Sequence, residues 1–239
     1  MLLRNVLICT ILLLLTMPFF HPGLPAQQND EHPELTQTLD RVDAVSAKFS
    51  TFTANFAQKR YLALLKEYES PETGDFYYSI DGNRDVQLRH EIRTPGVRIT
   101  TIKGDSVVVH QPSIKQAQVY NLGIGNRKNY VEYLATGLGQ SSAKLREQFE
   151  ITYDGAETIG GAPCSVLTLV PKDKSAAASV RSITVWFNNS TGTPMQYKFL
   201  EPTRDYMLLT FSQEKLNEKI PTDRFEQKLP KETEIFRLD

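Results

Sequence analysis

The sequence predicts a mainly β protein: an antiparallel meander with an N-terminal helix and a helical insertion. From Phe49 to Pro112, apolar and aromatic residues alternate with polar ones in run after run. A period of two is typical of strands with one buried face. Gly, Pro, Asn and Asp residues separate the runs at turn-like intervals. Few reactive side chains occur here, so the pattern favours an apolar concave sheet over a catalytic site.

Residues 1–26 have the features of a secretory signal peptide. Arg4 precedes an apolar stretch from Val6 to Leu15, and a Pro- and Gly-containing segment follows before Ala26. The stretch is too short for a membrane span, so we expect a cleaved signal and a periplasmic mature protein. The cut site stays open, because Leu24 is larger than the usual small residue there. The remaining residues, 27–239, number about 210 and are expected to form a single domain.

Two segments show helical rather than strand spacing. The first follows Pro33, a residue suited to a first helical turn, and its apolar positions are Leu35, Leu39, Val42, Val45 and Phe49. The second, residues 129–149, predicts one or two short helices broken by Gly137 and Gly139. A helical insertion that interrupts a sheet is a candidate lid. Strands are expected again from Ile151 onward.

Apolar residues at matching strand positions define a candidate cavity, because residues i and i+2 share one face. Such a face must be covered by the protein's own core or by a ligand. The strand residues predicted to line the cavity are Phe56, Phe76, Tyr78, Ile80, Leu88, Ile99, Val107 and Val109. From the lid, Leu134 and Leu138 are expected to join them.

Several functional classes are disfavoured by composition. Without Arg4, 26 Lys and Arg oppose 28 Asp and Glu, a net charge of −2 that offers no basic surface for nucleic acid. The spacing of His32, His90 and His110 suits no shared metal site, and no nucleophile elbow occurs. We therefore expect no enzyme activity, no metal and no cofactor. Cys164 is the sole cysteine after residue 26, which excludes an internal disulfide and favours a small buried hydrophobe.

Several local motifs occur in an order that resembles the LolA-like family of periplasmic lipoprotein carriers. The segments that carry the resemblance are Phe52–Lys59, Gly74–Tyr78, Ile102–Asp105 with Gln111 and Pro112, Leu169–Lys172, and Phe225 with Leu229–Lys231. Together they extend over nearly the whole chain after the signal. The resemblance implies an unclosed antiparallel β-barrel, a strongly curved sheet, with short helices as a lid over an acyl-binding cavity.

The resemblance also implies a function and partners. It suggests a monomeric, non-enzymatic carrier that shields acyl chains of lipoproteins or related lipids from the inner to the outer membrane. Its partners would be an inner-membrane releasing complex and an outer-membrane acceptor. Arg84 corresponds to the family's latch arginine, which would hydrogen-bond lid carbonyls, although Asp85 replaces the usual proline. The alternative is an envelope-stress or lipid-sensing binding module with the same fold.

Overall fold

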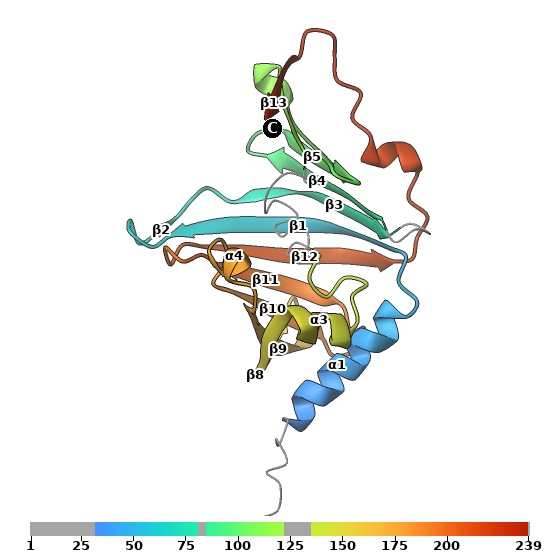
Figure 1. Ribbon diagram of the computed structural model, residues 1–239, viewed down its shortest axis with the longest axis vertical. Helices are drawn as coiled ribbons and strands as arrows, with labels where there is room; N and C mark the ends of the chain where they lie inside the picture. Colours follow the sequence, from blue (N-terminus) through green and yellow to red (C-terminus); the bar gives the residue numbers. More distant parts are fainter. Residues whose placement is uncertain (1–31, 81–84, 122–134, 239) are drawn as a thin grey trace, which may run out of the picture. The chain divides into compact units, whose positions relative to one another are not determined.

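One sheet of 13 strands organises the protein in a computed structural model that describes residues 32–80, 85–121 and 135–238 (Figure 1). The strand order is β13-β7-β6-β5-β4-β3-β1-β12-β11-β10-β9-β8, and the short β2 pairs with β1. The pairings are antiparallel except that of β13 with β7. Since β13 and β8 end the order, the sheet stays open. The predicted open, strongly curved antiparallel sheet is therefore confirmed.

The strand bounds follow the turn signals of the sequence. The strands are β1 (Thr51–Leu62), β2 (Glu67–Tyr68), β3 (Glu72–Ile80), β4 (Val86–Thr94), β5 (Arg98–Lys103), β6 (Ser106–Gln111), β7 (Gln116–Asn121), β8 (Phe149–Ile159), β9 (Ala162–Pro171), β10 (Ser182–Asn188), β11 (Pro194–Leu200), β12 (Tyr206–Leu216) and β13 (Glu234–Leu238). The helices are α1 (Pro33–Ser46), α3 (Ser142–Gln148) and α4 (Lys174–Ala177), with 3₁₀ turns η1 (Pro112–Ile114) and η3 (Thr222–Phe225).

The N-terminal helix is confirmed, with Pro33 in its first turn and Glu34 near its positive end. It buries Leu35, Leu39 and Val42, which recur at helical spacing, and contacts α3, β8 and β9. Helix α3 confirms part of the predicted insertion, but residues 122–134 lie outside the described residues. The proposed signal peptide also lies outside them.

The strand register assigns residues to two faces of the sheet. Phe52 lies opposite Tyr78, and Tyr78 lies opposite Leu88, so these three side chains share the concave, inner face. The same face continues across the other half of the sheet through Leu209, Tyr197, Val185 and Leu167. Its side chains form the main hydrophobic core together with α1, residues 135–138 and α3.

The outer face carries a smaller apolar cluster. Cys164 lies there with Val166, Trp186 and Met195, and its thiol is fully buried and free. The prediction of Cys164 as a small buried hydrophobe is thus confirmed, and burial raises the pKa of this thiol. Residues 217–233, the strap, connect β12 to β13 and cover another part of the outer face, where Phe225 of η3 is buried and η3 contacts β4 and β5.

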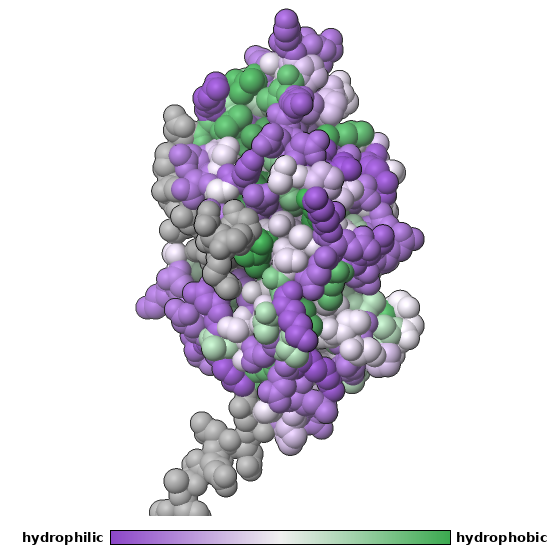
Figure 2. Space-filling model, turned by 90° about the vertical axis from the view of Figure 1, so that its right-hand side faces the viewer, coloured by the Kyte–Doolittle hydropathy of each residue, from purple (hydrophilic) through white to green (hydrophobic). Residues whose placement is uncertain are grey.

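The surface view from the right-hand side of Figure 1 is mostly hydrophilic (Figure 2). Hydrophobic patches occur at the end that carries β13, whose exposed apolar residues are Ile235, Phe236 and Leu238. All described elements belong to one compact unit within residues 31–239. In the described part of the chain, none of the helices has the length and apolarity needed to cross a membrane.

Candidate functional site

The inner face brings together most of the predicted cavity residues. Phe76 and Leu88 are fully buried at its centre. The other predicted residues in the core are Phe56, Tyr78, Val107 and Leu138, with Ile80 and Val109 packed against it. In this structure the face is therefore closed, because the protein's own side chains occupy it.

Ile99 lies on the opposite face from the one predicted. Its register partners are Glu91 and His110, whereas Ile102 is the β5 residue that pairs with Leu88 and Val107. The strap crosses the outer face at this point, where the Gln227 side chain donates to the Ile99 carbonyl at 3.1 Å. The residue is thus part of the strap contact and does not line the inner face.

Leu134 and Arg84 lie outside the described residues, so the predicted latch remains a prediction. The described part of the predicted lid begins with residues 135–141, the closing turn, which leads into α3. Residues Ala135, Thr136 and Leu138 of this turn are at most 2% exposed, so it packs deeply onto the inner face.

A buried hydrogen bond joins the closing turn to the sheet. The Tyr197 hydroxyl on β11 donates to the Thr136 carbonyl oxygen at 2.7 Å. Burial, with a smaller contribution from nearby Tyr78, raises the pKa of Tyr197 well above its usual value, so this group stays a neutral donor. A buried tyrosine hydroxyl needs such a partner, and here a backbone carbonyl of the turn provides it.

Two glycines let the closing turn approach the sheet. Gly137 (φ +79°) and Gly139 (φ +65°) have left-handed backbone that other residues rarely adopt. A Cβ at Gly137 would lie 2.8 Å from the Phe187 ring, and one at Gly139 would lie 2.6 Å from the Phe49 ring. Both glycines are therefore needed for the close packing of the closed state.

Helix α1 holds the far end of the closing turn. Asp43 accepts hydrogen bonds from the Ser142 backbone N–H at 2.7 Å and from the Ser142 hydroxyl at 2.6 Å. Ser141 caps the same α3 terminus by accepting from the Lys144 N–H. A carboxylate that accepts from the first N–H groups of a helix is favoured by both hydrogen bonding and the helix dipole.

Polar residues replace apolar ones on the inner face toward the β2 end. Gln58 is buried and donates to Glu72 at 2.5 Å, and Arg98 contacts the same carboxylate at 3.1 Å. His90, partly accessible, stacks on Phe56 with ring centroids 4.2 Å apart. Burial, and secondarily the Arg98 charge, lower the pKa of His90 to about 3, so its imidazole is neutral at pH 7. The inner face thus has an apolar centre and a polar end.

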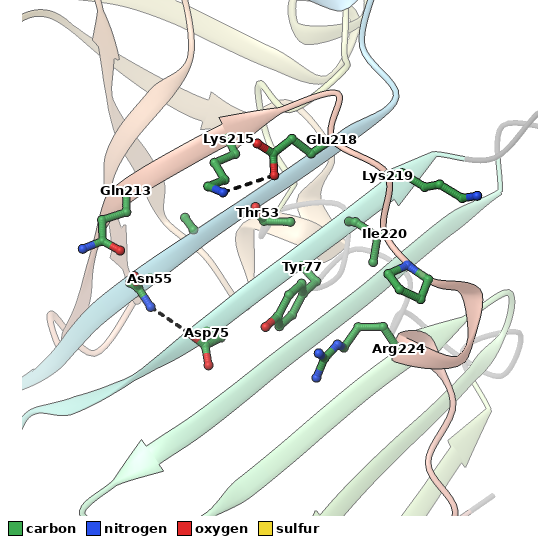
Figure 3. A pocket seen from close by; sticks show the side chains of 12 residues that line it. Thr53, Asn55, Asp75, Tyr77, Gln213, Lys215, Glu218, Lys219, Ile220 and Arg224 are labelled. Atoms are coloured by element: carbon green, nitrogen blue, oxygen red, sulfur yellow. Dashed lines mark hydrogen bonds and ion pairs between the residues drawn. The ribbon is translucent and has the colours of Figure 1, made fainter.

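A hollow of about 290 Å³ lies on the outer face between the sheet and the strap (Figure 3). Several of its charged groups have partners: Asp75 contacts Asn55 at 2.7 Å and Arg93 at 3.2 Å, and Lys215 pairs with Glu218 at 3.3 Å. The Arg224 guanidinium lies over the Tyr77 ring at 4.9 Å. A polar, internally paired surface is poorly suited to an apolar ligand, so the inner face is the better candidate.

No group of His, Cys, Asp and Glu among the described residues is arranged to hold a metal ion. What the inner face offers is apolar surface under a cover held by the hydrogen bonds of Tyr197 and Asp43. Neither residue was a candidate on sequence grounds; the available signal for Tyr197 was a hydroxyl on an otherwise apolar strand face.

Comparisons with known proteins agree with this geometry. The family model for the outer membrane lipoprotein carrier protein LolA matches residues 47–228. Curated proteins give no match. An uncharacterized conserved protein from Thermus thermophilus superposes with a TM-score of 0.53 at 12% identity, covering 86% of this chain and 99% of that one.

MucB superposes with a TM-score of 0.50 at 13% identity, covering 82% of this chain and 63% of MucB. The chain thus spans less than two thirds of MucB. The lipoprotein LppX of Mycobacterium tuberculosis gives a TM-score of 0.46 at 15% identity, covering 80% of this chain and all of that one (100%). At these identities, the likeness to the Thermus thermophilus protein and to MucB shows the fold alone. The family match covers well over half of the sequence, and the chain therefore belongs to the LolA family of outer membrane lipoprotein carrier proteins.

Proposed function

We propose that the protein is a non-enzymatic carrier that shields acyl chains of lipoproteins or related lipids on its inner face as they cross the periplasm. The observation that carries the proposal is an apolar face closed by a turn that hydrogen bonds hold in place, Tyr197 to Thr136 foremost. Family membership supports the same cargo class. Opening the closing turn would expose the apolar centre to an acyl chain.

The energetics fit a carrier. Burying each CH₂ group gains about 0.8 kcal/mol relative to water, so an acyl chain in the periplasm strongly favours a dry site. An acyl chain that arrives from a membrane was already out of water, so the net free energy of its transfer to the protein is close to zero. The free energy of closing the empty inner face then decides loading and release. The contacts of Tyr197, Asp43, Gly137 and Gly139 set this closing free energy.

Native mass spectrometry of the mature protein purified from its own periplasm tests the proposal. We expect a bound species whose mass matches an acylated lipoprotein or a lipid. Purified protein that carries no such species, and that binds no fluorescent fatty acid added to it, would contradict the carrier role.

A sensor module is the second candidate, and MucB motivates it. MucB has been solved in complex with MucA, so a protein with this fold binds a protein partner. In that case a membrane protein partner would bind with an affinity that depends on the lipid state of the inner face. A carrier instead releases its lipid to acceptor membranes, and a lipid-transfer assay separates the two.

A further inference from the structure

The turn between β1 and β2 presents two leucines to solvent. Leu64 is 92% exposed and Leu65 is 59% exposed, the largest exposures among the large apolar side chains that the structure describes. The hairpin, with Tyr61 paired to Tyr68, lies at a tip of the sheet, at the left in Figure 1. Exposing two adjacent leucine side chains to water is unfavourable in free energy, and burying them against a partner would remove this penalty.

Hydrogen bonds hold this turn in a fixed shape. The Lys66 N–H donates to the Leu62 carbonyl and the Ala63 N–H donates to the Asp205 carboxylate, each at 2.8 Å. At the base of the hairpin, Arg60 forms an ion pair of 2.8 Å with Glu201. The leucines therefore project from an anchored turn.

Three tyrosines lie together on one face of the sheet near the hairpin, because Tyr61 pairs with both Tyr68 and Tyr206. Tyr61 stacks on Tyr206 with ring centroids 5.0 Å apart and meets the Tyr68 ring edge-on at 5.1 Å. The hydroxyls of Tyr68 and Tyr206 are hydrogen-bonded to each other. Behind them, the amines of Lys59 and Lys198 lie over the Tyr68 and Tyr206 rings, each 4.5 Å from the centroid.

Apart from the exposed Lys66 and Glu67, which directly follow Leu65, the groups of the hairpin are arranged like the layers of a membrane surface. Leucines favour the hydrocarbon, tyrosines favour the headgroup level, and lysines extend their amines toward water. Two of the positive charges near the tip have a negative charge beside them, because Arg60 pairs with Glu201 and Lys66 precedes Glu67 in the sequence. We propose that the tip, Leu64 and Leu65, inserts into the surface of a lipid bilayer and docks the protein there.

Docking at this tip would bring the inner face near the membrane. Strand β1 runs from Phe56 on the inner face to Leu62 at the turn, six residues that extend about 20 Å. The polar end of the inner face, with Gln58, lies between them. The proposal concerns membrane contact and holds whether or not the inner face carries an acyl chain.

An environment-sensitive nitrobenzoxadiazole label at Leu64→Cys tests the insertion. Cys164 is fully buried, so labelling is directed to the new thiol. With vesicles of phosphatidylethanolamine and phosphatidylglycerol, we expect a blue shift and a several-fold rise in emission. Ile114→Cys, at a 55% exposed apolar residue in another turn, provides the matched control and should not respond. No change at position 64, or an equal response at both positions, would overturn the proposal.

The double variant Leu64→Gln/Leu65→Gln tests whether the tip supplies the binding energy. We expect its partitioning onto the same vesicles to fall by about tenfold or more, since two leucine side chains lose their burial. Ile114→Gln should partition like the wild type. Both variants should keep the wild-type melting temperature and fatty-acid binding without vesicles, which separates tip failure from inner-face failure. Wild-type partitioning of the double variant would show that the tip is not the membrane contact.

Discussion

The Tyr197 hydroxyl donates a 2.7 Å hydrogen bond to the carbonyl oxygen of Thr136, and both residues are fully buried. The donor comes from β11 on the inner face of the sheet, and the acceptor comes from the closing turn. This bond ties the cover to the apolar surface it protects. Its strength contributes to the free energy of opening, which makes Tyr197 the first residue to change.

Tyr197→Phe should favour the open state. The variant keeps the ring against Phe199 and Phe211 and removes one buried hydrogen bond, about 1 kcal/mol or about fivefold in the opening equilibrium. We expect faster hydrogen exchange in residues 135–141 and about fivefold tighter binding of a fluorescent fatty acid. Tyr77→Phe, on the outer face, is the control and should change neither. Wild-type exchange in Tyr197→Phe would show that this bond does not hold the cover.

Asp43→Asn should loosen the other end of the closing turn. The variant weakens two charge-assisted hydrogen bonds to Ser142 and removes a negative charge at the start of α3, a loss of about 1 kcal/mol. Hydrogen exchange should rise in α3 while β3 and β4 stay protected. Asp40→Asn, an exposed position on the same helix, should leave α3 unchanged. Equal exchange in the two variants would argue against the Asp43 contact.

Gly139→Ala separates packing of the cover from backbone strain. Alanine at Gly139 meets both a left-handed backbone and the side chains of Phe49 and Ile80. Gly104→Ala has a similar φ of +57° with nothing within 4 Å, so it shares only the strain, about 1 kcal/mol. We expect a larger loss of unfolding free energy for Gly139→Ala, together with tighter fatty-acid binding that Gly104→Ala does not show. Identical denaturation curves would mean that the turn does not pack as described.

His90 should make stability depend on pH. Its pKa is about 3 when folded and about 6.5 when unfolded, so between these values the unfolded state binds the proton. Stability therefore falls as pH falls through this window, by up to about 1.4 kcal/mol per pH unit. His90→Phe keeps a ring against Phe56 and should flatten that slope in urea denaturation at about pH 4 to 7. Exposed His32→Asn should keep it, and an unchanged slope in His90→Phe would contradict the assignment.

Strand periodicity allowed most of the inner face to be predicted, because Phe52, Phe76 and Leu88 alternate cleanly with polar residues. It failed in β5, where Ile99 and Ile102 are both apolar and have opposite parity. The register with Leu88 selects Ile102 for the inner face. On the outer face, the strap from η3 to Gln227, far along the chain, covers this part of the sheet, and the Gln227 side chain donates to the Ile99 carbonyl. That cover is a tertiary contact that local alternation does not encode.

The contacts that close the face were also beyond sequence reasoning. Tyr197 and Thr136 are 61 residues apart, and the acceptor is a backbone carbonyl, which has no residue signature. Asp43 lies 99 residues before Ser142 and resembles any polar helix residue. The glycines of the closing turn were visible as helix breakers. Their close contacts with Phe187 and Phe49 depend on the folded sheet.

Photo-crosslinking with a diazirine-bearing fatty acid tests the central claim, that the inner face takes the acyl chain, most directly. After irradiation and digestion, we expect the label on peptides with inner-face residues, chiefly those containing Phe76 and Leu88, and more of it in Tyr197→Phe. Unlabelled fatty acid in excess should suppress it. Label confined to the outer hollow around Tyr77 and Arg224, or no specific label, would contradict the claim.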